Sequence, residues 1–141
     1  MTHKDLSKSG HRLLGVVAWT ETKFNDLCRG NNDSGIDSDW TPLMNTDSET
    51  MMKEGCLLAG ATWNETKKVL GWSNEDVDRV FCHQVGQAHR KLLYETLGLD
   101  PEKDFSTLEI LGNTGAASLP ITLAIGEEQG AVKKGDKVAL L

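Results

Sequence analysis

The stretch DVDRVFCHQVGQAHRKLLYETLG, residues 76–98, decides the fold because its hydrophobic pattern changes halfway along. Residues 76–82 run from polar to apolar, which is typical of a buried strand. Residues 86–97 have the spacing of an amphipathic helix that Gly98 ends. The side chains expected on the inward face of that helix are Ala88, Leu92, Leu93 and Leu97. We therefore expect a strand that leads directly into a helix, with His83 at the junction.

The same alternation continues on both sides of this stretch. Further strands are expected at residues 11–20, 105–111 and 137–141, and further helices at residues 48–70 and 116–129. Pro120 falls near the start of the last helix, where proline is tolerated. Strands that alternate with helices predict an α/β fold, in which helices pack on a mixed, largely parallel sheet.

Local signals mark both ends of the helix expected at residues 48–70. Thr46 and Glu49 have the spacing of a capping box, and Gly71 is a plausible stop. The apolar stripe of this helix is expected to contain Met51, Met52, Gly55, Leu58 and Ala59. The two methionines are read as core filling rather than as ligands.

Composition excludes several classes of function. The chain has 141 residues, of which 38% are hydrophobic and 26% charged, so it can form a domain with a core. Its net charge of −6 argues against a nucleic-acid surface, which needs clustered basic residues. No apolar run approaches the roughly 20 residues that a membrane span needs.

The cysteine pattern bears on redox chemistry and on metals. Cys28, Cys56 and Cys82 form neither a disulfide framework nor a zinc motif, which favours a reducing, cytoplasmic setting. The polar loop at residues 29–42 resembles a calcium loop, but Pro42 stands where that motif requires glutamate. We expect no metal site.

Two polar residues occupy equivalent places in the expected fold. His83 and Asn113, thirty residues apart, each follow an expected strand and precede an expected helix. Sites in open α/β sheets form outside the carboxyl ends of the strands, so these side chains could converge. Two N–H donors aimed at one point suit a developing oxyanion, and Asn113 is also at an expected helix N-terminus, where the helix dipole favours negative charge.

The residue pattern leaves a simpler interpretation open. A histidine after a strand is often a hydrogen-bonded structural residue, and asparagine in Gly-Asn-Thr-Gly is often a turn residue. Cys82 adjoins His83 but should point to the opposite face, because successive strand residues alternate. We therefore expect Cys82 to lie in the core rather than to act as a nucleophile.

Longer motifs resemble a known family. HQVGQAH, then GNTGAASLPITLA, then KKGDKVALL resemble the C-terminal half of thiolase-fold condensing enzymes, and in particular β-ketoacyl-acyl-carrier-protein synthase III. HRLLG, FNDLCRG and DVDRVFCHQVGQAH resemble the branch that joins two long acyl-CoA chains in olefin biosynthesis. The resemblance implies a thiolase-like half-domain at residues 11–141 whose last strands are missing, after a leader at residues 1–10.

The resemblance also assigns roles to residues. The family uses a Cys–His–Asn set, and His83 and Asn113 match its histidine and asparagine. The family's nucleophilic cysteine, and the glutamate base proposed for the branch, belong to an N-terminal half that this chain does not contain. Val85-Gly86-Gln87 departs from the usual Ala-Asn pattern, so carrier-protein or pantetheine contacts are not transferred to this site.

The function that the resemblance implies is Claisen condensation of two acyl thioesters, with His83 and Asn113 stabilising the enolate. The substrates would be acyl-CoA or acyl-carrier-protein thioesters, and no permanently bound cofactor is expected. The complete enzyme would be a homodimer, and this chain alone would be inactive. Alternatives are a non-catalytic thiolase-like module for binding or dimerisation, and another thiolase-fold activity such as hydroxymethylglutaryl-CoA synthase or polyketide synthase.

Overall fold

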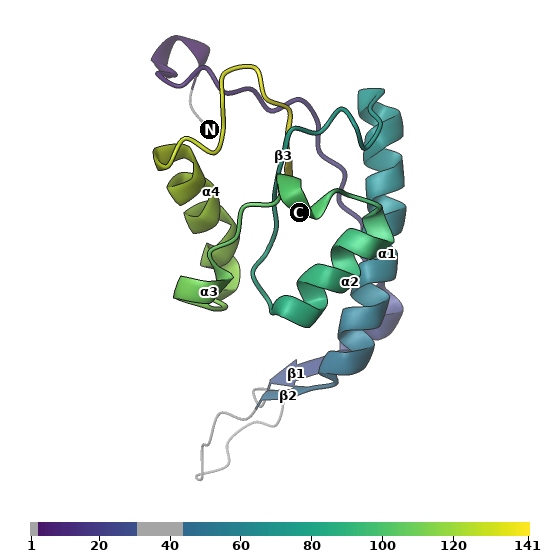
Figure 1. The fold of residues 1–141 in the computed structure, drawn as a ribbon. Coiled ribbons are helices and arrows are strands. Elements are labelled where there is room, and N and C mark those ends of the chain that lie inside the picture. The colour runs from purple at the N-terminus through teal and green to yellow at the C-terminus, as the bar shows by residue number, and fades with distance from the viewer. Residues whose placement is uncertain (1–2, 31–43) are drawn as a thin grey trace.

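The computed structural model describes residues 3–30 and 44–141 (Figure 1). Its α-helices are α1 (Ser48–Leu70), α2 (Gln87–Leu97), α3 (Leu108–Leu111) and α4 (Ser118–Glu128). Its strands are β1 (Cys28–Gly30), β2 (Met44–Thr46), β3 (Arg79–Phe81) and β4 (Val138–Leu140). Short 3-10 helices cover Lys4–Leu6, Thr22–Leu27, Pro101–Lys103 and Gly115–Ala117.

Two parallel strands lie at the centre of the fold. β3 pairs with β4 in the register Arg79 with Val138 and Phe81 with Leu140. The pair of strands separates α1 and α2 from α4, so helices cover both of its faces (Figure 1). The arrangement confirms the predicted α/β class with helices packed on a parallel sheet.

Alternation along β3 distributes the core between the two faces. Val80 and Cys82 belong to a buried cluster with residues of α1 and α2, whereas Phe81 packs toward Gly126 of α4. Phe105 lies beside Phe81, with ring centroids 5.7 Å apart. The buried cluster on the α1 and α2 side comprises Cys56, Trp63, Val77, Val80, Cys82, Leu93, Tyr94, Leu97, Leu99 and Ala139.

The bounds predicted for α1 are confirmed, although two details differ. Gly71 ends the helix in a left-handed conformation, with φ 65°. The N-cap is Asp47 rather than Thr46, because the Asp47 carboxylate accepts the Thr50 N–H at 3.0 Å. The buried residues of α1 are Cys56 and Trp63, while Met51 is 37% exposed. The predicted stripe is thus correct only in part, since Ala59 packs against the core but the fully buried positions are Cys56 and Trp63.

α2 and the last helix also begin close to where the sequence predicts. α2 buries Leu93 and Leu97 as expected, but Ala88 is exposed. α4 is preceded by the 3-10 turn Gly115–Ala117, and Pro120 lies in its first turn. The strand expected at residues 137–141 is confirmed as β4.

Two predicted strands are wrong. Residues 11–20 have no regular structure, and Leu13, Leu14 and Val16 are 58–68% exposed. Residues 105–111 contain α3, and the sheet pairing nearby is a single bridge between Asp104 and Val80. A strand needs a neighbour for its backbone N–H and C=O groups. No named strand pairs with either segment within the described residues.

A short antiparallel ribbon was not predicted. β1 pairs with β2 from Cys28 opposite Thr46 to Gly30 opposite Met44. The calcium-like pattern falls on Asn31, Asp33, Gly35 and Asp37, which lie outside the described residues.

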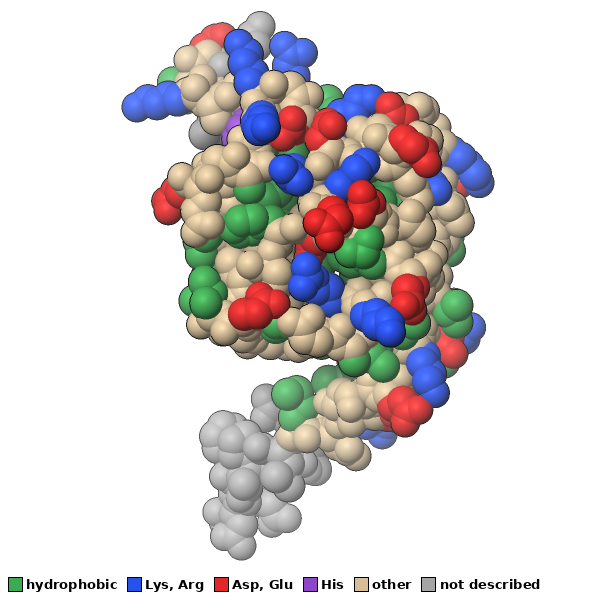
Figure 2. Space-filling model, viewed as in Figure 1, with side chains coloured by type: hydrophobic (Ala, Val, Ile, Leu, Met, Phe, Trp, Pro, Cys, Tyr) green, Lys and Arg blue, Asp and Glu red, His purple; other side chains and the backbone are tan. Residues whose placement is uncertain are grey.

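Charged side chains of both signs are interspersed on the face of the molecule that Figure 2 shows, with hydrophobic side chains between them. This face therefore carries no concentrated basic patch of the kind that binds nucleic acid. Among the helices described, none is long and apolar enough to cross a membrane.

Replacing Gly126 by alanine should lower the free energy of unfolding by about 1–3 kcal/mol, because it overpacks the α4 side of the core. The new Cβ would lie 2.5 Å and 2.9 Å from two carbons of the Phe81 ring, which is fully buried. Chemical denaturation of the two proteins measures the difference.

The matched control is Gly55→Ala in α1, where the added Cβ meets nothing within 4 Å. This substitution should raise stability by about 0.5–1 kcal/mol, because alanine is the better helix former. Equal effects at both positions would contradict the packing of Phe81 against α4.

Candidate active site

His83 lies in the short connection between β3 and α2. Its backbone N–H donates to the Leu141 carbonyl at 2.8 Å, which extends the pairing of the two parallel strands past β3. Its own carbonyl accepts the Val85 N–H at 3.1 Å. The side chain is half-buried. The prediction that His83 follows a strand is therefore correct.

Asn113 also lies in a junction, but it follows α3 rather than a strand. Its side-chain Oδ1 accepts the Gly115 N–H at 2.9 Å, which closes an Asx turn ahead of α4. Because the Gly115 N–H requires an acceptor, this hydrogen bond sets the orientation of the carboxamide. The Nδ2 hydrogens have no acceptor within the described chain, and the residue is exposed. The turn thus presents an N–H donor to the outside.

The backbone before Asn113 requires glycine. Gly112 has φ 63° and ψ −155°, a backbone conformation that residues other than glycine almost never adopt. The carboxamide of Asn113 therefore reaches its place through a sharp turn that a glycine alone allows.

Buried hydroxyl groups hold the segment from α3 to α4 in place. Thr107 and Thr122 share a hydrogen bond at 2.6 Å, and Thr122 also donates to the Ser118 carbonyl at 2.7 Å. The Ser118 hydroxyl accepts the Thr114 N–H at 3.0 Å. Thr107, Ser118 and Thr122 are each at most 2% exposed. The hydrogen bond to Ser118 therefore attaches Thr114, the residue after Asn113, to the core.

The two candidate donors come from separate loops. The β3–α2 connection that carries His83 descends between α2 and the segment of α3 and α4 (Figure 1). No hydrogen bond joins His83 to Asn113 within the part of the chain that the structure describes. Convergence of the two side chains on one substrate atom remains a prediction.

The cysteines differ sharply in their surroundings. Cys82 is 1% exposed, and burial together with the Asp104 carboxylate raises the pKa of its thiol to about 12. Burial also raises the pKa of Cys56, which lies inside α1. Cys28 is exposed in β1. Since the thiolate is the nucleophile, Cys82 is a poor candidate despite lying beside His83.

We expect iodoacetamide at pH 8 to alkylate Cys28 and to leave Cys56 and Cys82 unmodified in the folded chain. The reason is that the two buried thiols are neither ionised nor accessible. Mass spectrometry of tryptic peptides measures the modification, and the same reaction in urea should label all three cysteines. Rapid labelling of Cys82 in the folded chain would contradict its assignment to the core.

A carboxylate that no sequence pattern marks lies at the centre of a polar network. Asp104, whose side chain is 0% exposed, accepts from Arg90 Nε and from the Tyr94 hydroxyl at 2.6 Å. Burial and the same carboxylate raise the pKa of Tyr94. Asp104 follows an ordinary Pro-Glu-Lys turn, so nothing in its sequence context indicated burial.

His89 is a second histidine near the β3–α2 connection. It lies in the first turn of α2, and its Nδ1 atom is buried without a hydrogen-bond partner among the described residues. Burial lowers the pKa of His89, and the proximity of His83 lowers it further. Both effects favour the uncharged form of His89.

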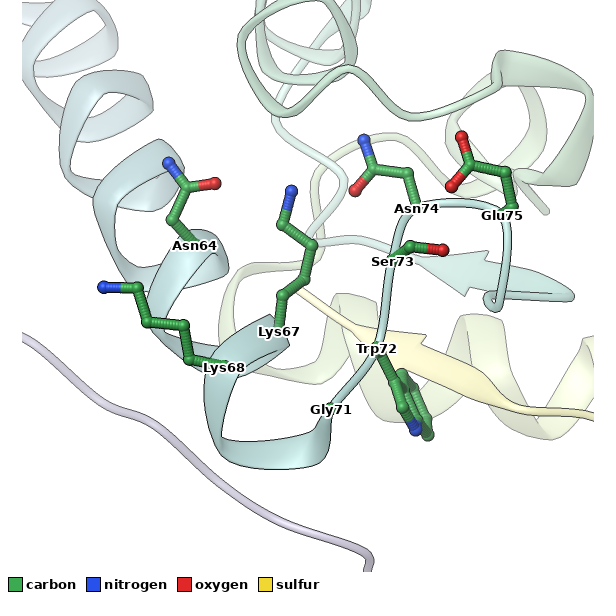
Figure 3. Close-up of a pocket in the computed structure, with 8 residues that line it drawn as sticks. All are labelled: Asn64, Lys67, Lys68, Gly71, Trp72, Ser73, Asn74 and Glu75. Atoms are coloured by element: carbon green, nitrogen blue, oxygen red, sulfur yellow. The ribbon is translucent and has the colours of Figure 1, made fainter.

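A shallow hollow of about 510 Å³ lies at the C-terminal end of α1 (Figure 3). Asn64, Lys67 and Lys68 line it from the helix, and residues 71–75 line it from the following loop. The Asn74 side chain has a structural role, since it accepts a hydrogen bond from Trp63 Nε1 and donates one to the Leu97 carbonyl. The hollow contains neither His83 nor Asn113.

Within residues 3–30 and 44–141, no three His, Cys, Asp or Glu side chains gather closely enough to hold an ion.

Residues 68–141, just over half of the chain, match the family described as 3-Oxoacyl-[acyl-carrier-protein (ACP)] synthase III C terminal. The chain is 38% identical over 131 residues to the acyl-CoA:acyl-CoA alkyltransferase of Shewanella oneidensis, covering 93% of this chain and 38% of that protein. The alkyltransferase of Xanthomonas campestris pv. campestris is 38% identical over 141 residues, covering 100% of this chain and 39% of that protein.

The fold agrees with these matches. The crystal structure of a Cys-to-Ser variant of Xanthomonas campestris OleA with bound lauric acid and lauroyl-CoA superposes with a TM-score of 0.83. The two sequences are 38% identical, and the match covers 98% of this chain and 38% of that chain. This chain thus spans less than half the length of the relatives it matches.

The matched segment contains β3, α2, α4 and β4 together with both candidate donors, His83 and Asn113. The chain therefore belongs to the 3-oxoacyl-acyl-carrier-protein synthase III C-terminal family of thiolase-fold condensing enzymes.

Proposed function

We propose that this chain is the C-terminal part of an acyltransferase that joins two acyl thioesters by Claisen condensation. The observation that carries the proposal is the Asx turn at Asn113. The Gly115 N–H engages the carboxamide oxygen at 2.9 Å, which leaves the Nδ2 hydrogens for an external oxygen. Membership of the condensing-enzyme family and the placement of His83 at the end of β3 support the same role.

The proposed reaction has two stages. In the first, a cysteine thiolate outside this chain attacks an acyl thioester, forms an acyl-cysteine and releases the first thiol. In the second, another acyl thioester loses its α-proton to a base, or a carboxylate as CO₂, and becomes an enolate. The enolate carbon attacks the acyl-cysteine carbonyl, so the C–S bond breaks and the cysteine thiolate is restored.

His83 and Asn113 act in the second stage. Each donates an N–H to the enolate oxygen, which carries more negative charge than the thioester carbonyl from which it forms. Donors already fixed at such an oxygen stabilise the transition state without reorganisation. For this role the imidazole of His83 must carry a proton on the nitrogen that faces the substrate.

The nucleophile is supplied by another polypeptide segment in this proposal. Cys82 and Cys56 are buried thiols with raised pKa values, and Cys28 lies in β1 rather than at a strand-to-helix turn. The chain covers 39% of the Xanthomonas campestris relative, which leaves room for such a segment. We propose the N-terminal half of the same enzyme as that partner.

Exposed apolar side chains support a partner of this kind. Leu13, Leu14 and Val16 lie on the outside of the irregular N-terminal segment, and Ile110 and Leu111 are exposed beside Asn113. Contiguous exposed apolar patches usually mark interfaces, and a sister half of the enzyme would cover such side chains. We therefore expect the isolated chain to self-associate, which light scattering measures.

A hybrid enzyme tests the proposal. This chain would replace the matching 39% of the Xanthomonas campestris alkyltransferase, and the hybrid would be incubated with lauroyl-CoA. Mass spectrometry should detect a condensed product, and circular dichroism should confirm that the hybrid is folded. A folded hybrid that forms the acyl-cysteine but no carbon–carbon bond would count against the proposal and favour a non-catalytic module.

A further inference from the structure

The two proposed donors lie on loops that no direct hydrogen bond connects in the described chain. One oxygen can accept from both only if each nitrogen lies within about 3 Å of it. A displacement of about 1 Å can reduce the rate of a reaction by about 100-fold. Something other than His83 and Asn113 must therefore set the spacing of the loops.

Gln84, the residue after His83, is hydrogen-bonded to the start of its own loop and to the segment that precedes α3. It is 2% exposed. Its Nε2 donates to the Cys82 carbonyl at 2.7 Å, on the other side of His83. Its Oε1 accepts from the Ser106 hydroxyl at 3.0 Å. A buried carboxamide with both ends bonded leaves the His83 backbone little freedom.

Ser106 continues the connection toward Asn113. Its hydroxyl lies 3.0 Å from Glu109 Oε2 as well as from Gln84 Oε1, and its single hydrogen serves these acceptors one at a time. The same oxygen accepts the Leu108 N–H at 3.2 Å, at the first residue of α3. Ser106 is thus bonded both to the His83 loop and to the short helix that leads to Asn113.

Glu109 completes a second connection on the solvent side. Its Oε1 accepts from Gln87 Nε2 at 2.8 Å, so the far end of the His83 loop is also bonded to α3. The α3 backbone, Gln87 and Ser106 lower the pKa of Glu109, which keeps the carboxylate ionised. Since Glu109 is 54% exposed, water competes for this connection more than for the one through Gln84.

We infer that Gln84, Ser106 and Glu109 are positioning residues that hold the His83 loop and the Asn113 loop at a set spacing. The inference rests on the proposed function, in which both loops serve one oxygen. α3 spans four residues and is followed by Gly112 and Asn113, so Ser106 and Glu109 anchor the segment that leads to Asn113. We call these three residues the polar brace.

The first test uses nuclear magnetic resonance on this chain. Gln84→Met removes both hydrogen bonds of the carboxamide while keeping its length, and Ser106→Ala removes the hydroxyl. Both should shift the resonances of the Gly115 N–H and the Asn113 side-chain amide, which Gln84 does not contact. Gln129→Met, at an exposed position after α4, is the matched control and should leave them unchanged.

Ser106→Thr retains the hydroxyl and should restore the original resonances. Folded Gln84→Met and Ser106→Ala proteins with unchanged Asn113 and Gly115 resonances would overturn the inference. If Gln84→Met does not fold, the resonances of Ser106→Ala alone test the inference. Ser106→Ala should fold, because Ser106 is partly exposed and alanine is close to it in size.

The second test measures kinetics in the hybrid enzyme. Gln84→Met and Ser106→Ala should lower kcat for condensation by up to about 100-fold and leave formation of the acyl-cysteine unchanged. Equal rates for these variants and the parent hybrid would overturn the inference. A parent hybrid without activity would refute the proposed function alone, because the resonance test on this chain detects the brace independently of catalysis.

Discussion

Replacing Asp104 by alanine should lower the free energy of unfolding by about 3–5 kcal/mol, which is the usual effect of removing one partner from a buried ion pair. The Asp104 carboxylate is fully buried and accepts from Arg90 and Tyr94, which come from successive turns of α2. Without it, the Tyr94 hydroxyl loses its acceptor inside the core, where the residue is 3% exposed. Urea denaturation with a probe of helix content measures the change.

The outcome depends on burial, and two further variants show this. Asp104→Asn keeps an acceptor for Tyr94 and should destabilise the chain less than alanine does. Glu49→Ala removes the partner of Lys53 on the exposed surface of α1 and should leave stability nearly unchanged. A loss for Asp104→Ala no larger than that for Glu49→Ala would show that Asp104 is not the buried centre of the network.

His83→Ala and Asn113→Ala in the hybrid enzyme should each reduce the rate of condensation by about 100–1,000-fold, because each removes a donor from the enolate oxygen. Formation of the acyl-cysteine should continue, since that step uses the partner segment. The rates come from quenched reactions with lauroyl-CoA, in which the acyl-enzyme and the condensed product are quantified separately.

Two comparisons make this result specific. Asn113→Asp keeps the Asx turn, because its carboxylate can still accept the Gly115 N–H, but it removes the donor and should be as impaired as alanine. His11→Ala and Asn64→Ala alter the same residue types at exposed positions outside the proposed site and should retain the parent rate. Full activity of Asn113→Asp would exclude the carboxamide as a donor.

The sequence predicted those elements whose signals are local. α1 carries its cap, its helical spacing and its terminal glycine within one continuous segment, and its predicted bounds agree with the structure. The same is true of α2, which ends at Gly98 in a left-handed conformation. His83 was located correctly because the change from strand pattern to helix pattern occurs at that residue.

The wrong predictions concern elements whose formation depends on distant neighbours. Residues 11–20 are apolar enough for a strand, but pairing must come from another segment, and the described chain offers none. Residues 105–111 have a similar composition, yet the Ser106 hydroxyl bonded to the Leu108 N–H begins a helix there. Composition reports a preference for burial, and tertiary contacts decide whether that preference becomes a strand.

The α/β class, the bounds of α1 and α2 and the position of His83 after a strand follow from sequence alone, because each depends on a pattern within one continuous segment. Packing of distant segments decided the burial of Asp104 and the polar brace of Gln84, Ser106 and Glu109. The partners in these contacts lie up to 22 residues apart along the chain, and the local sequence around one residue does not indicate the other. Hydrogen bonds between such residues form only after packing brings their segments together, so the pattern of a single segment cannot reveal them.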